Sequence, residues 1–286
     1  MVFVNELVSS ILLAIVQGIT EWLPVSSSGH LVLFEKILGF EGSLVFDVAL
    51  HFGTLMAVFV YFGGDIIDII RDLLSGKFST ESGRIGLLVI AATIPSVVVG
   101  FLLRDIFDSI FRGLGITAMG FAVTGVFLII SSLSSSGFGP HVFSPARPPE
   151  KTLAKSSVSL SKKKGGFGYG KALLVGVAQA FALFPGVSRS GATIGSGLLL
   201  GLSEKSAMKF SFLMSIPVIF GANLLVIGNN VLPPNLIWAS LVSFVIGLIV
   251  IHLLYGKVLT KRKNLAWFGV YALILAAALG IWILVM

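Results

Sequence analysis

The 286-residue chain is 56% hydrophobic and only 12% charged, and its formal net charge at pH 7 is +7. About a quarter of the residues of a soluble domain are charged, so this composition excludes an ordinary soluble globular fold. The absence of cysteine excludes disulfides and thiolate chemistry. We attribute the positive charge to basic cytoplasmic loops rather than to nucleic-acid binding.

Six apolar stretches are long enough to cross a bilayer, which takes about twenty residues in a helix. They are residues 44–62, 85–103, 114–133, 207–227, 236–255 and 265–285. In lipid every backbone polar group has to be satisfied within the protein, and helices of this length do so. The sequence therefore predicts an all-α integral membrane protein with six transmembrane helices.

Two further apolar stretches, residues 7–34 and 172–200, are each interrupted near the middle by a polar patch that contains proline. A break facing lipid would leave backbone groups unpaired, at several kcal/mol each. Breaks at membrane depth are tolerated only where they are buried in protein or line a cavity. We predict that each stretch is a re-entrant hairpin of two half-helices.

Residues 134–170 are rich in serine, glycine, proline and lysine, which predicts a basic, disordered cytoplasmic linker. The linker separates a first repeat, residues 1–133, from a second repeat, residues 171–286. With an offset of 162 positions (179 − 17), VSSSG at 25–29 aligns with VSRSG at 187–191 without a gap. Each repeat holds one hairpin and three spans. Because three is odd, the second repeat enters the membrane from the opposite side, which makes an inverted-topology repeat.

The charges of the loops predict the orientation. If the N-terminus is outside, the inside loops hold three, six and four Lys or Arg residues, whereas the outside loops hold two and none. The inside loops are residues 63–84, 134–170 and 256–264. The positive-inside rule then places both termini outside a plasma membrane.

Each hairpin has the pattern Ser-x-Ser-Gly where its second half-helix should begin. Serine is a favoured N-cap, and glycine lets a ligand approach the backbone closely. The free N–H groups and positive dipole end of a helix N-terminus suit phosphate, so two such N-termini near the midplane can hold a diphosphate. The plainer interpretation is that these residues only cap broken helices; the second copy, and Arg189 within it, favour a binding site.

The two copies differ where chemistry would be asymmetric: the aligned pairs are Glu21 with Leu183, His30 with Ala192, and Ser27 with Arg189. One repeat offers an acid and a base, and the other offers a cation. Ionisable residues at membrane depth are expensive and indicate function. Arg189 has two interpretations: a structural ion pair with Glu21, or a bidentate clamp on phosphate oxygens.

QGITEWLPVSSSGHL and FPGVSRSGATI resemble the two signature regions of the undecaprenyl-diphosphate phosphatase family, also called the bacitracin-resistance family, and FDVALHFGTL fits the same pattern. The resemblance covers nearly the whole chain apart from the linker. It implies a membrane enzyme that converts a polyprenyl diphosphate lipid to the monophosphate and phosphate, recycling the lipid carrier of cell-envelope glycan assembly. It implies a divalent cation in many members, Mg²⁺ or Ca²⁺, and no organic cofactor is expected.

The resemblance also assigns residues. The predicted catalytic residues are Glu21, His30, Ser27 and Arg189. The predicted substrate-binding residues are Gln17, Ser26, Ser28, Gly29, Ser188, Ser190, Gly191 and Thr193. Many members carry a second glutamate where this chain has Gln17. A neutral amide weakens a two-carboxylate metal site and leaves Glu21 as its one predicted ligand.

Several alternatives stay open at this point. Ser27, a histidine or water can be the nucleophile, and a homodimer is compatible with the sequence. A transporter or flippase of a phosphorylated polyprenyl lipid is the main rival function, because inverted repeats with broken helices are common in transporters. The joint presence of Glu21 and His30 in one repeat favours an enzyme. Asp47 and His51 in the first span are interpreted either as part of the family's pattern or as a buried hydrogen-bonded pair one helical turn apart.

Overall fold

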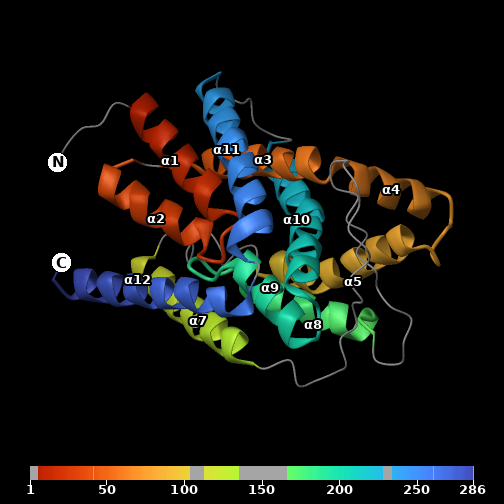
Figure 1. The fold of residues 1–286 in the computed structure, drawn as a ribbon. Coiled ribbons are helices and arrows are strands. Elements are labelled where there is room, and N and C mark those ends of the chain that lie inside the picture. The colour runs from red at the N-terminus through yellow and green to blue at the C-terminus, as the bar shows by residue number, and fades with distance from the viewer. Residues whose placement is uncertain are drawn as a thin grey trace.

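The computed structural model describes residues 6–40, 42–103, 113–134, 166–227, 234–259 and 261–285, and within these ranges all regular structure is helical (Figure 1). In the first half of the chain the helices are α1 (Glu6–Thr20), α2 (Ser27–Leu38), α3 (Leu44–Tyr61), α4 (Gly63–Leu74), α5 (Glu81–Leu102) and α7 (Leu114–Leu133). In the second half they are α8 (Tyr169–Phe181), α9 (Arg189–Leu199), α10 (Glu204–Ile227), α11 (Pro234–Leu253) and α12 (Leu265–Val285). A π-helical turn, η1 (Leu254–Val258), and a 3₁₀ turn, η2 (Arg262–Asn264), precede α12.

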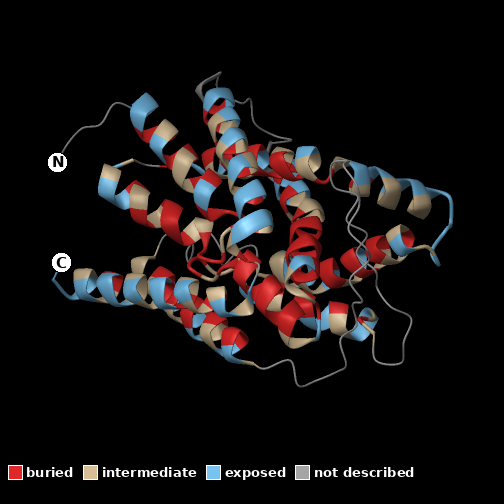
Figure 2. Ribbon diagram, viewed as in Figure 1, coloured by how far each residue is buried: buried red, intermediate tan, exposed pale blue. Residues whose placement is uncertain are grey.

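The prediction of an all-α fold with six helices suited to crossing a membrane is confirmed for the described ranges. These helices are α3, α5, α7, α10, α11 and α12. Large hydrophobic side chains cover their outward faces; Phe101 on α5, for example, is 71% exposed. Figure 2 shows exposed residues along the outer sides of α11 and α12 and buried residues where α3, α9 and α10 meet. Such an outer surface suits lipid.

The two interrupted stretches form the helix pairs α1–α2 and α8–α9, and the chain leaves helical geometry at a proline-containing segment within each pair. Proline lacks an N–H donor and disfavours helical geometry in the residue before it. Both second helices begin at a serine cap. Ser26 Oγ accepts from the Gly29 N–H at 3.3 Å. Ser188 Oγ accepts from the Gly191 N–H at 3.0 Å. The two motifs therefore correspond in local structure as well as in sequence.

Helices from the two halves of the sequence pack against one another. Helix α7 lies along α12, α3 along α11, and α5 along α8 (Figure 1). Glycines allow very close approach: a Cβ added at Gly53 on α3 would come within 2.2 Å of the Ser240 carbonyl oxygen on α11. Likewise, a Cβ at Gly176 on α8 would come within 2.1 Å of the Ala92 carbonyl oxygen on α5. Because the halves interleave, the packing of the whole bundle holds the two helix breaks relative to each other.

One predicted connection contains a helix that the sequence analysis did not predict. Residues 63–84 contain helix α4 and the first turn of α5. Ile66 is buried, and Ile69 and Leu73 lie against Gly86 on α5. These apolar residues recur at spacings of three and four, the period of a short amphipathic helix. A search for long continuous apolar spans does not detect that pattern.

Much of the predicted connecting chain lies outside the described residues. This applies to residues 135–165 of the predicted linker, and to residues 104–112 and 228–233 of the predicted outside loops. The described ends of the linker are anchored: Arg262 Nη1 donates to the Ser134 carbonyl oxygen at 2.6 Å. Arg84 Nη2 donates to the Phe167 carbonyl oxygen at 3.1 Å.

Candidate active site

The two helix breaks are in direct contact. Ser190 Oγ, in the first turn of α9, donates to the Leu23 carbonyl oxygen between α1 and α2 at 2.8 Å. Gly29, in the first turn of α2, packs so closely that an added Cβ would come within 2.9 Å of Gly186 Cα. The two Ser-x-Ser-Gly motifs, far apart in sequence, are thus brought together by the fold.

Helix α7 supports the second break. Thr124 Oγ1 accepts from the Ser188 N–H at 2.9 Å and donates to the Gly186 carbonyl oxygen at 2.9 Å. Gly186 has a φ of 86°, in the left-handed region that favours glycine, and an added Cβ would lie 2.1 Å from the Thr117 carbonyl oxygen. The threonine hydroxyl satisfies one donor and one acceptor of backbone outside regular helix.

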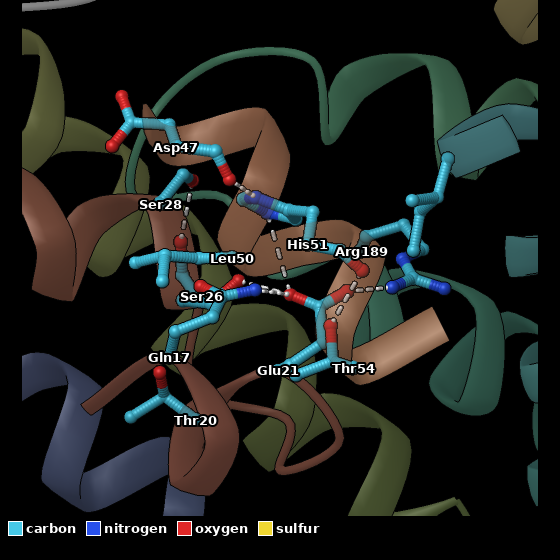
Figure 3. Close-up of polar contacts among 12 residues, drawn as sticks. Gln17, Thr20, Glu21, Ser26, Ser28, Asp47, Leu50, His51, Thr54 and Arg189 are labelled. Atoms are coloured by element: carbon cyan, nitrogen blue, oxygen red, sulfur yellow. Dashed lines mark hydrogen bonds and ion pairs between the residues drawn. The ribbon is translucent and has the colours of Figure 1, made fainter. Parts of the chain in front are cut away.

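The carboxylate of Glu21 lies at the centre of the contact between the breaks, and the residue is only 4% exposed. Its Oε2 accepts hydrogen bonds from Ser27 Oγ at 2.5 Å and from Gln17 Nε2 at 2.9 Å. Its Oε1 accepts from Nη2 of Arg189, which reaches it from α9 (Figure 3). His51 Nε2, on α3, lies 3.5 Å from Oε2. One buried carboxylate therefore joins residues from both halves of the chain.

Arg189 uses one terminal nitrogen for Glu21 and leaves the other unpaired. Nη1 is buried and has no hydrogen-bond partner among the described residues. The guanidinium lies over the ring of Trp22, with Cζ 5.5 Å from the ring centroid, which adds a cation–π attraction. A buried N–H without a partner is destabilising, and a phosphate oxygen is a strong acceptor for a guanidinium. The free Nη1 is therefore suited to an anionic ligand.

The backbone at Ser26 is strained. Its φ of 68° and ψ of 97° lie where residues other than glycine are rare. Conformations of this kind cost about 1–3 kcal/mol and cluster at functional sites. The side-chain cap on Gly29, together with a 3.3 Å contact between Ser26 Oγ and Ser28 Oγ, ties this residue to the first turn of α2. The next residue is Ser27, whose hydroxyl reaches Glu21.

The structure does not pair His30 with Glu21, although the sequence analysis treated them as an acid and a base acting together. His30 is buried, and both ring nitrogens have other partners. Nδ1 lies 2.7 Å from the Ser26 carbonyl oxygen, one helical turn earlier, and Nε2 lies 2.7 Å from the Tyr271 hydroxyl on α12. The contact with Ser26 directs the second nitrogen toward α12.

His51 is a site residue whose role the sequence analysis did not assign. Its partner in the predicted pair, Asp47, contacts it through the backbone: His51 Nδ1 lies 2.7 Å from the Asp47 carbonyl oxygen. Figure 3 shows the Asp47 carboxylate pointing away from the histidine and the imidazole pointing toward Glu21. The resemblance of the FDVALHFGTL segment to the family pattern was a signal for His51, but the sequence could not indicate which way its imidazole points.

The remaining predicted binding residues form the frame of the site. Gln17 is fully buried and is bound to Glu21. Ser188 Oγ lies 3.2 Å from Ser190 Oγ, as Ser26 does from Ser28 in the first break. Thr193 Oγ1 lies 2.6 Å from Ser211 Oγ on α10 and donates to the Arg189 carbonyl oxygen at 2.8 Å, so it braces α9.

The donor set around Glu21 does not fit a divalent cation held by the protein. Ca²⁺ takes six to eight oxygen ligands and Mg²⁺ takes six, and a site in which the protein itself supplies most of them needs several carboxylate or carbonyl oxygens. Here one oxygen of Glu21 already binds Arg189, and the other binds Ser27 and Gln17. Among the described residues no group of three or more histidine, cysteine or acidic side chains has the arrangement of a metal site. The chemistry below is therefore derived from the side chains alone.

Comparison with known proteins agrees with the motifs. Residues 10–278 match the family model described as bacitracin resistance protein BacA. The undecaprenyl-diphosphatase of Caldicellulosiruptor bescii is 40% identical over 94% of this chain and 95% of its own length. The undecaprenyl-diphosphatase of Korarchaeum cryptofilum is 35% identical over 96% of this chain and 98% of its own length. That of Teredinibacter turnerae is 43% identical over 75% of this chain and 74% of its own.

Proposed function

This chain belongs to the bacitracin resistance protein BacA family, and from that premise we propose that it hydrolyses a polyprenyl diphosphate of the undecaprenyl type to the monophosphate and phosphate. The monophosphate is the form of the lipid carrier that cell-envelope glycan synthesis uses again. One observation carries the proposal. Glu21 holds the hydroxyl of Ser27 on one oxygen and the guanidinium of Arg189 on the other. The buried carboxylate of Glu21 thus acts as the base for the nucleophile Ser27 and also contacts Arg189, the cation that binds phosphate.

We expect the diphosphate to bind at the N-termini of α2 and α9. The first N–H groups of each helix have no partner within the helix, and the positive end of the dipole favours phosphate. Arg189 adds the free Nη1. When the substrate enters, the guanidinium of Arg189 leaves Glu21 and binds phosphate oxygens, which accept hydrogen bonds from both of its terminal nitrogens. The ion pair and the phosphate clamp are then two stages of one cycle.

The contact between Ser27 and Glu21 supports serine as the nucleophile. Ser27 Oγ bonds to the terminal phosphorus while the bond from that phosphorus to the bridging oxygen breaks, and the polyprenyl monophosphate leaves. The hydroxyl proton passes to Glu21 Oε2, 2.5 Å away. Arg189 neutralises the charge that develops on the phosphoryl oxygens.

A second displacement restores the enzyme. Water bonds to the phosphorus of the serine phosphate, and the bond from phosphorus to Ser27 Oγ breaks. Glu21 returns its proton to Oγ, and the phosphate departs as dihydrogen phosphate. The same two side chains thus serve both steps, with Glu21 acting first as base and then as acid.

We propose that α1–α2 and α8–α9 are re-entrant hairpins and that residues 1–133 and 171–286 are inverted repeats joined by a cytoplasmic linker, residues 134–170. The matching serine caps, and the three long apolar helices that follow each hairpin, support this arrangement. The distribution of basic residues supports a plasma-membrane protein with both termini outside. The proposed chemistry uses residues of a single chain and does not require a homodimer.

The direct test is phosphate release by the purified chain in detergent. Undecaprenyl diphosphate and the shorter farnesyl diphosphate are supplied separately, and free phosphate is measured over time. We expect steady release from the long-chain substrate and none from a Ser27→Ala protein. A well-folded chain that binds the lipid diphosphate without releasing phosphate would contradict the proposal and would favour lipid transport.

A further inference from the structure

The contact between Tyr271 and His30 joins the last helix to the first hairpin, and the reaction steps above do not use it. Tyr271 lies on α12, and its hydroxyl oxygen is 2.7 Å from His30 Nε2 on α2. The two rings are nearly parallel, at 8°, with centroids 5.8 Å apart. The ring of Phe121 on α7 lies nearly perpendicular to the imidazole, at 88°, with a centroid distance of 5.3 Å. Two other helices therefore hold the histidine ring.

The partners of His30 determine which ring nitrogen carries its hydrogen. Nδ1 faces the Ser26 carbonyl oxygen, which only accepts hydrogen bonds, so Nδ1 is the donor. In the neutral ring Nε2 then has the lone pair, and the Tyr271 hydroxyl donates to it. If Nε2 takes a proton, the contact reverses, because a phenol oxygen also accepts. Tyr271 can therefore pair with His30 in both of its charge states.

The carbonyl group of Ser26 connects His30 to the proposed nucleophile, Ser27. The Ser26 carbonyl oxygen accepts the ring N–H of His30 at 2.7 Å and its backbone N–H at 3.2 Å. Ser26 has the positive φ noted above, and Ser27 follows it directly. If the ring changed tautomer or flipped, it would place a lone pair against that carbonyl oxygen. The repulsion would disturb the segment that presents Ser27 to Glu21.

We propose that Tyr271 is a positioning residue for the reaction. Its hydroxyl holds the His30 ring in the orientation that keeps Nδ1–H on the Ser26 carbonyl oxygen, and so keeps the strained Ser26 segment in place. The expected effect of Tyr271 on kcat rests on the proposed function, whereas the expected Nδ1–H tautomer of His30 does not depend on it. No sequence motif pointed to this residue, since Tyr271 stands alone in an otherwise apolar helix.

The kinetic test removes the hydroxyl and keeps the ring. In Tyr271→Phe the stacking surface stays, and we expect kcat to fall about tenfold with KM within about twofold, because one hydrogen bond that positions the reacting group is lost. If Tyr271 acts only through the histidine, His30→Ala/Tyr271→Phe should be no slower than His30→Ala. A normal kcat in Tyr271→Phe, or a double variant slowed by the product of the two single effects, would overturn the proposal.

Tyr61→Phe is the matched control. Tyr61 on α3 also lies beside a histidine, His252, with ring centroids 6.2 Å apart. Tyr61→Phe also removes one phenol hydroxyl, but from an aromatic cluster outside the proposed site. We expect unchanged kcat and KM. Melting temperature and monodispersity in detergent are recorded for both variants.

Nuclear magnetic resonance tests the tautomer and the contact with Tyr271 without substrate. The chain has four histidines, so ¹⁵N-histidine labelling gives few signals, and the signal lost in His30→Ala identifies His30. We expect the neutral ring to carry hydrogen on Nδ1 in the wild type, and Tyr271→Phe to shift the Nε2 signal. Hydrogen on Nε2 of the neutral wild-type ring would refute the proposal. The expected tautomer in a chain that releases no phosphate would instead count against the proposed function.

Discussion

Ser27 and Glu21, six positions apart on either side of the first helix break, are joined by a 2.5 Å hydrogen bond from the serine hydroxyl to the carboxylate. This length is that of a strong O–H···O⁻ bond. In a continuous helix, side chains six residues apart point in different directions, because each turn has 3.6 residues. The bond forms because the chain leaves helical geometry between the two residues. The break therefore creates the pair.

Replacement of Ser27 by alanine tests its role as nucleophile. Ser27→Ala should lower phosphate release on the order of 10⁶-fold, to background, as when the nucleophile of a serine hydrolase is removed. In the wild type, acid quenching early in the reaction followed by mass spectrometry should find phosphate on Ser27. Ser75→Ala, at an exposed serine after α4, is the control and should have wild-type activity. Retention of most activity by a folded Ser27→Ala protein would assign the attack to water.

Replacement of Arg189 by lysine tests the phosphate clamp. Arg189→Lys keeps the charge and loses the planar fork, so we expect activity to fall on the order of 100-fold, as when a preorganised charge stabiliser is removed. Arg71→Lys, on the exposed side of α4, is the control and should be unaffected. Phosphate release is measured beside monodispersity in detergent.

A purely structural ion pair predicts a different pattern for the same position. In that case Glu21→Gln and Arg189→Lys would each misfold, whereas Glu21→Gln with Arg189→Met would recover a folded protein. We expect instead that the single variants fold and are inactive, and that Glu21→Gln/Arg189→Lys is little slower than either one, because residues that act as a unit are not additive.

Introduction of a carboxylate at Gln17 tests how this site handles metal ions. Gln17 Nε2 donates to Glu21; Gln17→Glu replaces that donor with a second carboxylate, the kind of oxygen ligand that Mg²⁺ and Ca²⁺ prefer. We expect Gln17→Glu to retain activity and to be stimulated more strongly than the wild type by either ion. The measurement is phosphate release after chelation and after stepwise addition of each ion. Identical stimulation of the two proteins would show that position 17 does not influence metal binding.

Single cysteines test the proposed orientation, since the natural chain has none. An impermeant maleimide applied to whole cells should label Val231→Cys, in the loop predicted to be outside, and should leave Ser157→Cys in the predicted linker unlabelled until the cells are opened. Both variants should release phosphate at the wild-type rate. Labelling of position 157 but not 231 in intact cells would reverse the orientation.

The sequence predicted the features that depend on neighbouring residues. Long apolar runs predicted the six long helices because a helix satisfies its own backbone in an apolar medium. The prolines and the two Ser-x-Ser-Gly motifs predicted the breaks and the caps on Ser26 and Ser188, because capping is a contact within one helical turn. The apolar residues of α4, spaced three and four apart, were not recognised as a helix, since a short helix packed on α5 does not need a span-length apolar run.

Tertiary structure alone decided which side chains face one another. The ion pair of Glu21 with Arg189 was one of two interpretations that the sequence offered, and the structure contains it. The contacts of Glu21 with His51 and of His30 with Tyr271 were not predicted. These partners lie on α9, α3 and α12, and their positions depend on how the two halves of the chain interleave. A local sequence pattern sets the face of a helix on which a residue lies. The direction of a ring nitrogen or a guanidinium is set by the hydrogen bonds offered by distant helices, and that information is absent from the motif itself.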